Sequence, residues 1–171
     1  IGHPFQPFIF GQRSVGPKVA IQHGVNLIFY GENVAEYGNN IMDNYNPIMD
    51  PQLYTCYDID DQETHLGGMA IKDLYSKHAF ERSDLIPYRS PTMEQVSGLG
   101  LEVHYMSYYR KWVPQENFYY AVKNTMFEPA ETRTTGSYSK YSGLDDKLEW
   151  LHYYMMFIKY GMGRATADAS Q

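Results

Sequence analysis

The sequence has one cysteine, Cys56, among its 171 residues. A single cysteine forms no intramolecular disulfide and builds no zinc knuckle, and it suits a reducing compartment, so we expect a cytoplasmic protein. The six histidines show no metal-ligand spacing, which argues against a protein-bound transition metal. No apolar run approaches the roughly 18 residues of a membrane-spanning helix, so we expect no membrane insertion.

Basic residues are also scarce. The chain carries 14 lysines and arginines against 20 aspartates and glutamates, a net charge of −6, and no Lys or Arg occurs between residues 19 and 71. A nucleic-acid binder that relies on a broad basic surface needs clustered cations to neutralise phosphates, so we expect no nucleic-acid partner. Any anionic ligand must find its cations mostly in the second half of the chain.

Apolar and aromatic side chains are plentiful. Hydrophobic residues make up 43% of the chain, which is enough to build a core, and the length suits a single domain over residues 1–171. The 17 tyrosines predict flat, partly polar contact surfaces, although they name no chemistry by themselves.

A helix followed by an apolar strand is the main fold signal. Residues 12–23 have helical spacing and end at Gly24, which can stop a helix. Residues 25–30 (VNLIFY) have little polarity and are bounded by Gly24 and Gly31, which predicts an internal strand buried on both faces, as in parallel sheets. We therefore expect an α/β fold with a mostly parallel sheet flanked by helices.

The rest of the chain gives weaker signals until its last third. We expect a loop over 38–63, a helix over about 68–79, a strand over 101–109 and a helix over 114–124. The clearest helix is predicted over 143–160, capped by Ser142 and ended by Gly161. Its apolar stripe, which should pack against the sheet or a partner, comprises Leu144, Leu148, Leu151, Met155 and Ile158.

Two polar segments in the first half of the chain are candidate sites. Residues 58–61 (DIDD) offer hard oxygen ligands for Mg²⁺, although a solvated acidic loop explains them better. Residues 31–33 (GEN) follow the apolar strand directly, where open α/β sheets bind ligands. A carboxylate and an amide there are placed to meet a ribose, an amide or a metal-bound water. A plain strand-ending turn explains this tripeptide equally well.

A third segment, residues 136–147 (GSYSKYSGLDDK), places glycines, hydroxyls, Lys140 and Lys147 around the start of the predicted final helix. Free N–H groups at a helix N-terminus favour an anion, which predicts phosphate binding. A capped helix with a solvated first turn is the alternative. After this helix, Arg164 lies in a glycine-flanked turn, where it either grips a phosphate or carboxylate or pairs with the helix dipole.

Two long blocks of the sequence are distinctive. Residues 7–38 (PFIFGQRSVGPKVAIQHGVNLIFYGENVAEYG) and 136–170 (GSYSKYSGLDDKLEWLHYYMMFIKYGMGRATADAS) resemble the N-acetyl sugar amidotransferase family of bacterial surface-polysaccharide biosynthesis, which includes enzymes of O-antigen and pseudaminic-acid pathways. The resemblance covers nearly the whole chain. It implies a doubly wound, mostly parallel sheet of the PP-loop ATP pyrophosphatase type.

The resemblance also implies an activity. Members of this family use ATP, with Mg²⁺, to activate the carbonyl of an acetamido group on a sugar, and pyrophosphate is released. Ammonia then displaces AMP and leaves an acetamidino group. The implied partners are a nucleotide-sugar substrate and the glutaminase and synthase-like subunits that supply ammonia. An amide oxygen leaves poorly whereas an adenylate leaves well, which accounts for the use of ATP.

The family's SGGxDS-type phosphate loop and its upstream CxxC pair are absent from this sequence, which begins at Ile1 rather than Met. We therefore expect the C-terminal part of a longer protein, inactive by itself. The resemblance implies catalytic roles for Asp145, Asp146 and Lys147. It implies nucleotide- or phosphate-binding roles for Gly31, Glu32, Asn33, Lys140 and Arg164, and we assign no metal ligand.

Two other functions stay open. One is a non-catalytic module whose tyrosine-rich face docks the glutaminase and synthase partners. The other is a different PP-loop enzyme, such as a tRNA-modifying thiolase, which needs paired catalytic cysteines and a basic surface. Cys56 alone and the net charge of −6 argue against the thiolase.

Overall fold

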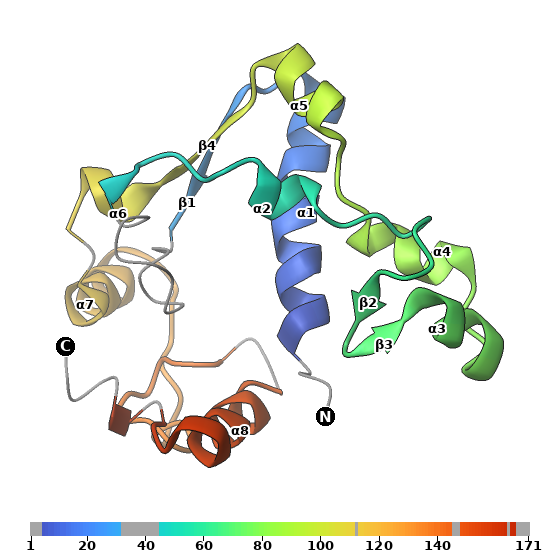
Figure 1. The fold of residues 1–171 in the computed structure, drawn as a ribbon. Helices are drawn as coiled ribbons and strands as arrows, with labels where there is room; N and C mark the ends of the chain where they lie inside the picture. The colour runs from blue at the N-terminus through green and yellow to red at the C-terminus, as the bar shows by residue number, and fades with distance from the viewer. Residues whose placement is uncertain (1–4, 32–44, 112, 145–147, 164, 167–171) are drawn as a thin grey trace. The chain divides into compact units, whose positions relative to one another are not determined.

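The structure is a computed structural model that describes residues 5–31, 45–111, 113–144, 148–163 and 165–166 (Figure 1). The chain forms two compact units. Unit 1 contains residues 6–111 and unit 2 contains residues 112–171, with the first few residues of the chain divided between them. The fold is mixed α/β with a small parallel sheet flanked by helices, which confirms the coarse fold prediction; a single domain over 1–171 stays a prediction.

Unit 1 holds most of the regular structure. Its elements, in chain order, are α1 (Phe5–His23), β1 (Leu27–Tyr30), α2 (Gln52–Thr55), β2 (His65–Leu66), β3 (Met69–Ala70), α3 (Ile71–Lys77), α4 (Arg82–Leu85), the 3₁₀ helix η3 (Ile86–Tyr88), α5 (Met93–Leu99), β4 (Glu102–Tyr105) and α6 (Met106–Tyr109). Unit 2 contains α7 (Pro114–Asn124) and α8 (Glu149–Tyr160). Among the described residues, no helix is both long and apolar enough to cross a membrane.

The first helix, α1, ends where the sequence predicts. Gly24 follows it with a φ of +67°, a conformation that glycine adopts without strain. The Gly24 N–H donates to the Ile21 carbonyl oxygen, and the Val25 N–H donates to the Ala20 carbonyl oxygen. These two bonds form a Schellman motif, which turns the chain from α1 directly into β1.

The predicted start of this helix, at residue 12, is wrong. The helix begins at Phe5 and carries Pro17 in its interior. Proline lacks an N–H and therefore removes one helical hydrogen bond. However, Pro17 is buried with Ser14 and Ala20 at three-residue spacing, and tertiary packing of one helix face is the main source of helix stability in proteins.

The parallel sheet pairs two segments that are distant in the sequence. β1 and β4 lie side by side (Figure 1), in a parallel register that sets Leu27 opposite Glu102 and Tyr30 opposite Tyr105. The prediction of a parallel strand is therefore confirmed. The prediction of an internal strand, buried on both faces, is wrong: among the described residues β1 has β4 as its only neighbour, and Leu27 and Phe29 are 44% and 51% exposed.

The strand β4 is better enclosed. Residues 47–49 run along its other side, where Ile48 forms an antiparallel bridge with His104. The strand predicted over 101–109 ends at Tyr105, because the next four residues turn into the short helix α6. The buried residues of β4, Val103 and Tyr105, alternate with the more accessible Glu102 and His104, which places the latter pair on the opposite face.

Two apolar clusters stabilise unit 1. The first lies under the parallel sheet and comprises the buried residues Ala20, Met49, Tyr54, Val96, Leu101, Val103 and Tyr105. The second lies around α3 and comprises Tyr57, Ile59, Leu66, Ile71, Leu74 and Leu85. The helix α1 serves both, because Ala20 belongs to the first cluster and Phe10 packs against the second.

The helix predicted over about 68–79 is present but starts later. Gly67 and Gly68 have φ values of +63° and +87° and form the turn between β2 and β3, so α3 begins only at Ile71. Ile71 and Leu74 are the buried residues of this helix. The loop expected over 38–63 contains the short helix α2, and residues 38–44 lie outside the described part of the chain.

In unit 2 the helix α7 has the bounds that the sequence predicts, beginning with Pro114 at its first turn. The helix predicted over 143–160 begins only at Glu149, after an N-cap residue, Leu148, that makes no side-chain cap. Its end at Gly161 is confirmed by a φ of +70°. Neither helix buries a side chain among the residues described, so the predicted apolar stripe is largely open to solvent.

Candidate functional site

Two of the predicted site residues lie in the described part of the chain. Gly31 follows the last residue of β1, at the carboxyl end of the parallel pair, as predicted. Lys140 lies in unit 2, where its Nζ donates a hydrogen bond of 3.0 Å to the Glu131 carbonyl oxygen. The two therefore belong to different units. Outside the described residues lie Glu32, Asn33, Asp145, Asp146, Lys147 and Arg164.

The predicted start of the final helix at residue 143 is wrong, because α8 begins six residues later. Phosphate binding by this segment stays a prediction. Ser142, the expected cap, is buried in a turn instead. Its hydroxyl lies 2.5 Å from the Ser139 hydroxyl, and its carbonyl oxygen accepts a hydrogen bond from the Thr134 hydroxyl. The hydroxyl-rich segment therefore satisfies its own polar groups instead of presenting them to a helix start.

The best-defined chemical arrangement is a set of three side chains that we call the His104 cluster: Glu102, His104 and Tyr109. The His104 Nε2 lies 2.9 Å from a carboxylate oxygen of Glu102, and its Nδ1 lies 2.5 Å from the Tyr109 hydroxyl. Glu102 and His104 share one face of β4, and Tyr109 comes from α6, which follows the carboxyl end of that strand. This is the same end of the parallel pair at which Gly31 leaves β1.

The protonation pattern of the cluster follows from what each atom can do. An ionised carboxylate only accepts hydrogen bonds, so the contact with Glu102 assigns the imidazole proton to Nε2. The Nδ1 of His104 is then an acceptor, and the Tyr109 hydroxyl donates to it. A carboxylate that orients a histidine, which in turn accepts from a hydroxyl, is the arrangement that activates hydroxyl groups in many enzymes.

Aromatic rings pack around the ring of Tyr109. Phe29, the register partner of His104 on β1, lies with its ring 5.7 Å from the rings of both His104 and Tyr109. Tyr108 packs edge-on against Tyr109 at 5.8 Å. Phe29, Tyr108 and Tyr109 are each at least half exposed. The Tyr109 hydroxyl is positioned by its contact with the His104 Nδ1.

Sequence reasoning missed this cluster. The segment LEVHY shows the alternation that places Glu102 and His104 on one face of a strand, so their proximity was predictable. The contribution of Tyr109 was not, because the expected strand over 101–109 would have carried that residue away from His104. The chain instead turns back into α6.

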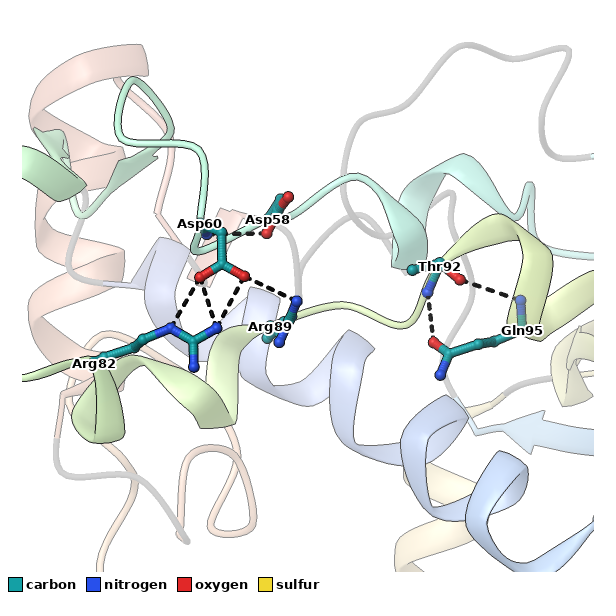
Figure 2. A network of polar contacts seen from close by, with 6 residues as sticks. All are labelled: Asp58, Asp60, Arg82, Arg89, Thr92 and Gln95. Atoms are coloured by element: carbon teal, nitrogen blue, oxygen red, sulfur yellow. Dashed lines mark hydrogen bonds and ion pairs between the residues drawn. The ribbon is translucent and has the colours of Figure 1, made fainter.

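The acidic segment over residues 58–61 forms ion pairs. Asp60 accepts hydrogen bonds from the Nε and Nη2 of Arg82, at 2.8 to 3.0 Å. The Nη2 of Arg89 lies 2.9 Å from the Oδ2 of Asp60 (Figure 2). Hydrogen bonding from Arg82, with the charges of Arg82 and Arg89, lowers the pKa of the Asp60 carboxyl. Its oxygens therefore face arginines, which argues against the Mg²⁺ alternative for this segment.

A shallow, open hollow of about 460 Å³ lies beside this ion pair. Its walls include Gln62, Tyr75, Glu81 and Arg82. The charged side chains that line it already have structural partners. Arg82 forms an ion pair with Asp60, and Glu81 takes part in a capping box at the start of α4. Because these charged groups already serve the structure, the His104 cluster is the stronger candidate site.

The chain matches no known family model and no curated protein.

Proposed function

We propose that this chain is the C-terminal part of an ATP-dependent N-acetyl sugar amidotransferase of bacterial surface-polysaccharide biosynthesis, acting in the cytoplasm. The observation that carries the proposal is the parallel β1–β4 pair. The strand β1 lies within the block over residues 7–38 that resembles this family, and its carboxyl end leads into Gly31. Ligands of open α/β folds bind outside the carboxyl ends of parallel strands. The proposal also includes the fold: we propose that β1 and β4 belong to a larger sheet of the PP-loop type.

The reaction converts an acetamido group on a nucleotide-sugar into an acetamidino group. ATP would activate the carbonyl oxygen as an adenylate, with release of pyrophosphate, and ammonia from a glutaminase and synthase-like partner would displace AMP. Within the described residues no three His, Cys, Asp or Glu side chains lie close enough to hold a metal ion. The proposal gives Mg²⁺ no ligands there. It assigns catalytic roles to Asp145, Asp146 and Lys147. It assigns nucleotide or phosphate contacts to Gly31, Glu32, Asn33, Lys140 and Arg164.

Two measurements test this proposal. The first is the reading frame upstream of Ile1, which we expect to encode an SGGxDS-type loop. The second is an assay of the complete gene product with an N-acetylated nucleotide-sugar, ATP, Mg²⁺ and ammonia. We expect pyrophosphate, AMP and a product in which the acetamido oxygen is replaced by NH, identified by mass spectrometry. The absence of any nucleotide-sugar conversion across a panel of N-acetylated substrates, with a well-folded protein, would refute the proposal.

One observation favours the docking alternative for unit 2. The helix α8 exposes large apolar side chains, with Trp150, Phe157 and Ile158 each more than half exposed. Exposed apolar surface of this kind marks interaction sites. If unit 2 only docks the ammonia-supplying subunit, replacing Phe157 and Ile158 by serine will abolish glutamine-dependent activity while free ammonia still supports turnover. Equal loss with both nitrogen sources would argue for a direct role in catalysis.

A further inference from the structure

We propose that Tyr109 transfers a proton to and from the bound substrate, with His104 as its proton acceptor and Glu102 as the group that orients His104. The substrate class, which rests on the function proposed above, is an acetamido group activated at its oxygen, together with ammonia. The proposal is carried by the two short contacts of His104, one to a carboxylate and one to a phenol.

Burial separates the roles of the three residues. The His104 side chain is only 12% exposed. Its two ring nitrogens contact the Glu102 carboxylate and the Tyr109 hydroxyl. Tyr109 is 54% exposed, so this residue is far more accessible than the His104 side chain. Glu102 is 57% exposed, and its carboxylate lies 2.9 Å from the His104 Nε2. The relay therefore runs from an exposed residue to an enclosed base.

The proton balance of the step is simple. As the nitrogen of ammonia bonds to the activated carbonyl carbon, one N–H proton passes to the Tyr109 oxygen. The proton of the phenol passes to His104 Nδ1, and the imidazolium so formed is paired with Glu102. The leaving group departs with the electron pair of its C–O bond. Return of the proton from His104 to Tyr109, and from Tyr109 to solvent or product, restores the cluster.

The neighbouring tyrosine provides a matched control. Tyr108 and Tyr109 are adjacent on α6 and are 53% and 54% exposed, but only Tyr109 contacts His104. An aryl sulfonyl fluoride reports on activation of the phenol: the tyrosine oxygen bonds to sulfur, the S–F bond breaks, fluoride leaves, and the phenolic proton goes to the base. This readout needs neither ATP nor a sugar.

The first experiment labels the complete gene product with an aryl sulfonyl fluoride and locates the adduct by fragmentation mass spectrometry. We expect Tyr109 to react at least about tenfold faster than Tyr108, since a positioned base contributes about 10²–10⁴-fold to proton transfer. The preference should vanish in His104→Gln and weaken in Glu102→Gln, and it should persist in Tyr108→Phe. Circular dichroism of each variant checks the fold. Equal labelling of Tyr108 and Tyr109 in the wild-type protein overturns the proposal.

The second experiment measures turnover by the complete gene product. Tyr109→Phe, which keeps the ring, should lower kcat by about 100-fold or more with little change in KM. An active wild type with a fully active Tyr109→Phe variant overturns the catalytic role of Tyr109 and leaves the amidotransferase proposal intact. Selective labelling of Tyr109 in a protein that converts no acetamido sugar has the opposite meaning: the relay stands and the proposed function falls.

Discussion

Tyr57 and Ser90 hold each other through two hydrogen bonds. The Tyr57 N–H donates to the Ser90 hydroxyl oxygen at 3.2 Å, and the Ser90 N–H donates to the Tyr57 carbonyl oxygen at 2.9 Å. The Ser90 hydroxyl also lies 3.4 Å from that of Ser14, a buried residue of α1. This small polar group ties α1 to the segments on either side of the α3 region.

We predict that Ser90→Ala destabilises the protein by about 1–2 kcal/mol, because the Tyr57 N–H then loses its partner in a half-buried position. Ser14→Ala is the matched comparison, since its hydroxyl makes only longer contacts of 3.3 and 3.4 Å, and it should cost less than about 1 kcal/mol. Urea unfolding of both variants measures the difference. A Ser14→Ala variant less stable than Ser90→Ala would contradict this account.

The Tyr57 side chain should respond differently from its backbone. Its ring stacks on Phe10 at 4.7 Å, but its buried hydroxyl has no hydrogen-bond partner among the described residues. Tyr57→Phe keeps the stack and removes a polar group that folding leaves unsatisfied. We therefore predict that this variant is as stable as the wild type or more stable by about 1 kcal/mol at neutral pH. A loss of stability above about 1 kcal/mol would show that the hydroxyl has a partner.

The same residue predicts how stability changes at alkaline pH. Burial, together with the neighbouring Tyr75 and Tyr88, raises the pKa of Tyr57 from 10.0 to about 12. The unfolded chain releases this proton first, so the contribution of Tyr57 is complete below pH 10 and is lost as the pH rises toward about 12. Tyr57→Phe should flatten the alkaline loss of unfolding free energy, as measured by urea unfolding across this pH range.

The Asp60 ion pairs predict a response at acid pH. Because hydrogen bonding from Arg82 lowers the pKa of Asp60 below its unfolded value of 3.8, its contribution is present above that value and is lost as the pH falls below it. Asp60→Asn should remove this part of the acid dependence, and added salt should weaken the wild-type effect. The control is Asp58→Asn, which keeps the oxygen that accepts from the Asp60 N–H. Acid dependence identical in Asp60→Asn and wild type would contradict the assignment.

Two glycines should give opposite results when replaced by alanine. Gly24 has a φ of +67°, and an added Cβ there meets nothing within 4 Å, so Gly24→Ala should cost about 1 kcal/mol through backbone strain alone. Gly98 lies in α5 with ordinary helical geometry and equally open surroundings, so Gly98→Ala should stabilise the protein by about 0.5–1 kcal/mol. Thermal denaturation of the two variants, compared with wild type, tests both signs together.

The parts of the fold that sequence reasoning predicts are those decided by local chemistry. Gly24 and Gly161 end their helices because each takes a positive φ, and Pro114 begins α7 because its missing N–H is not needed in a first turn. The parallel pairing of β1 is predicted by its low polarity. These signals are local and do not depend on the rest of the chain.

The parts that sequence reasoning mispredicts depend on contacts between distant residues. Pro17 sits within α1 because its burial with Ser14 outweighs a lost hydrogen bond, and no local pattern reveals that burial. The exposed face of β1 depends on how many neighbours the strand has. In the candidate site, Tyr109 meets His104 only because the chain turns into α6, which the alternation of residues 101–109 hides.

The pairing of β1 with β4 also has a consequence for how the protein folds. It joins Leu27 to Glu102, so the loop between them must close before any bond of the parallel ladder forms. Closing a long loop costs more entropy than forming a helical turn, and proteins that rely on distant pairings fold more slowly. The Schellman turn at Gly24 and the capping box at Thr92 need only nearby residues. We therefore expect α1 and α5 to be structured early, with the two strands and the His104 cluster assembling together in a late step.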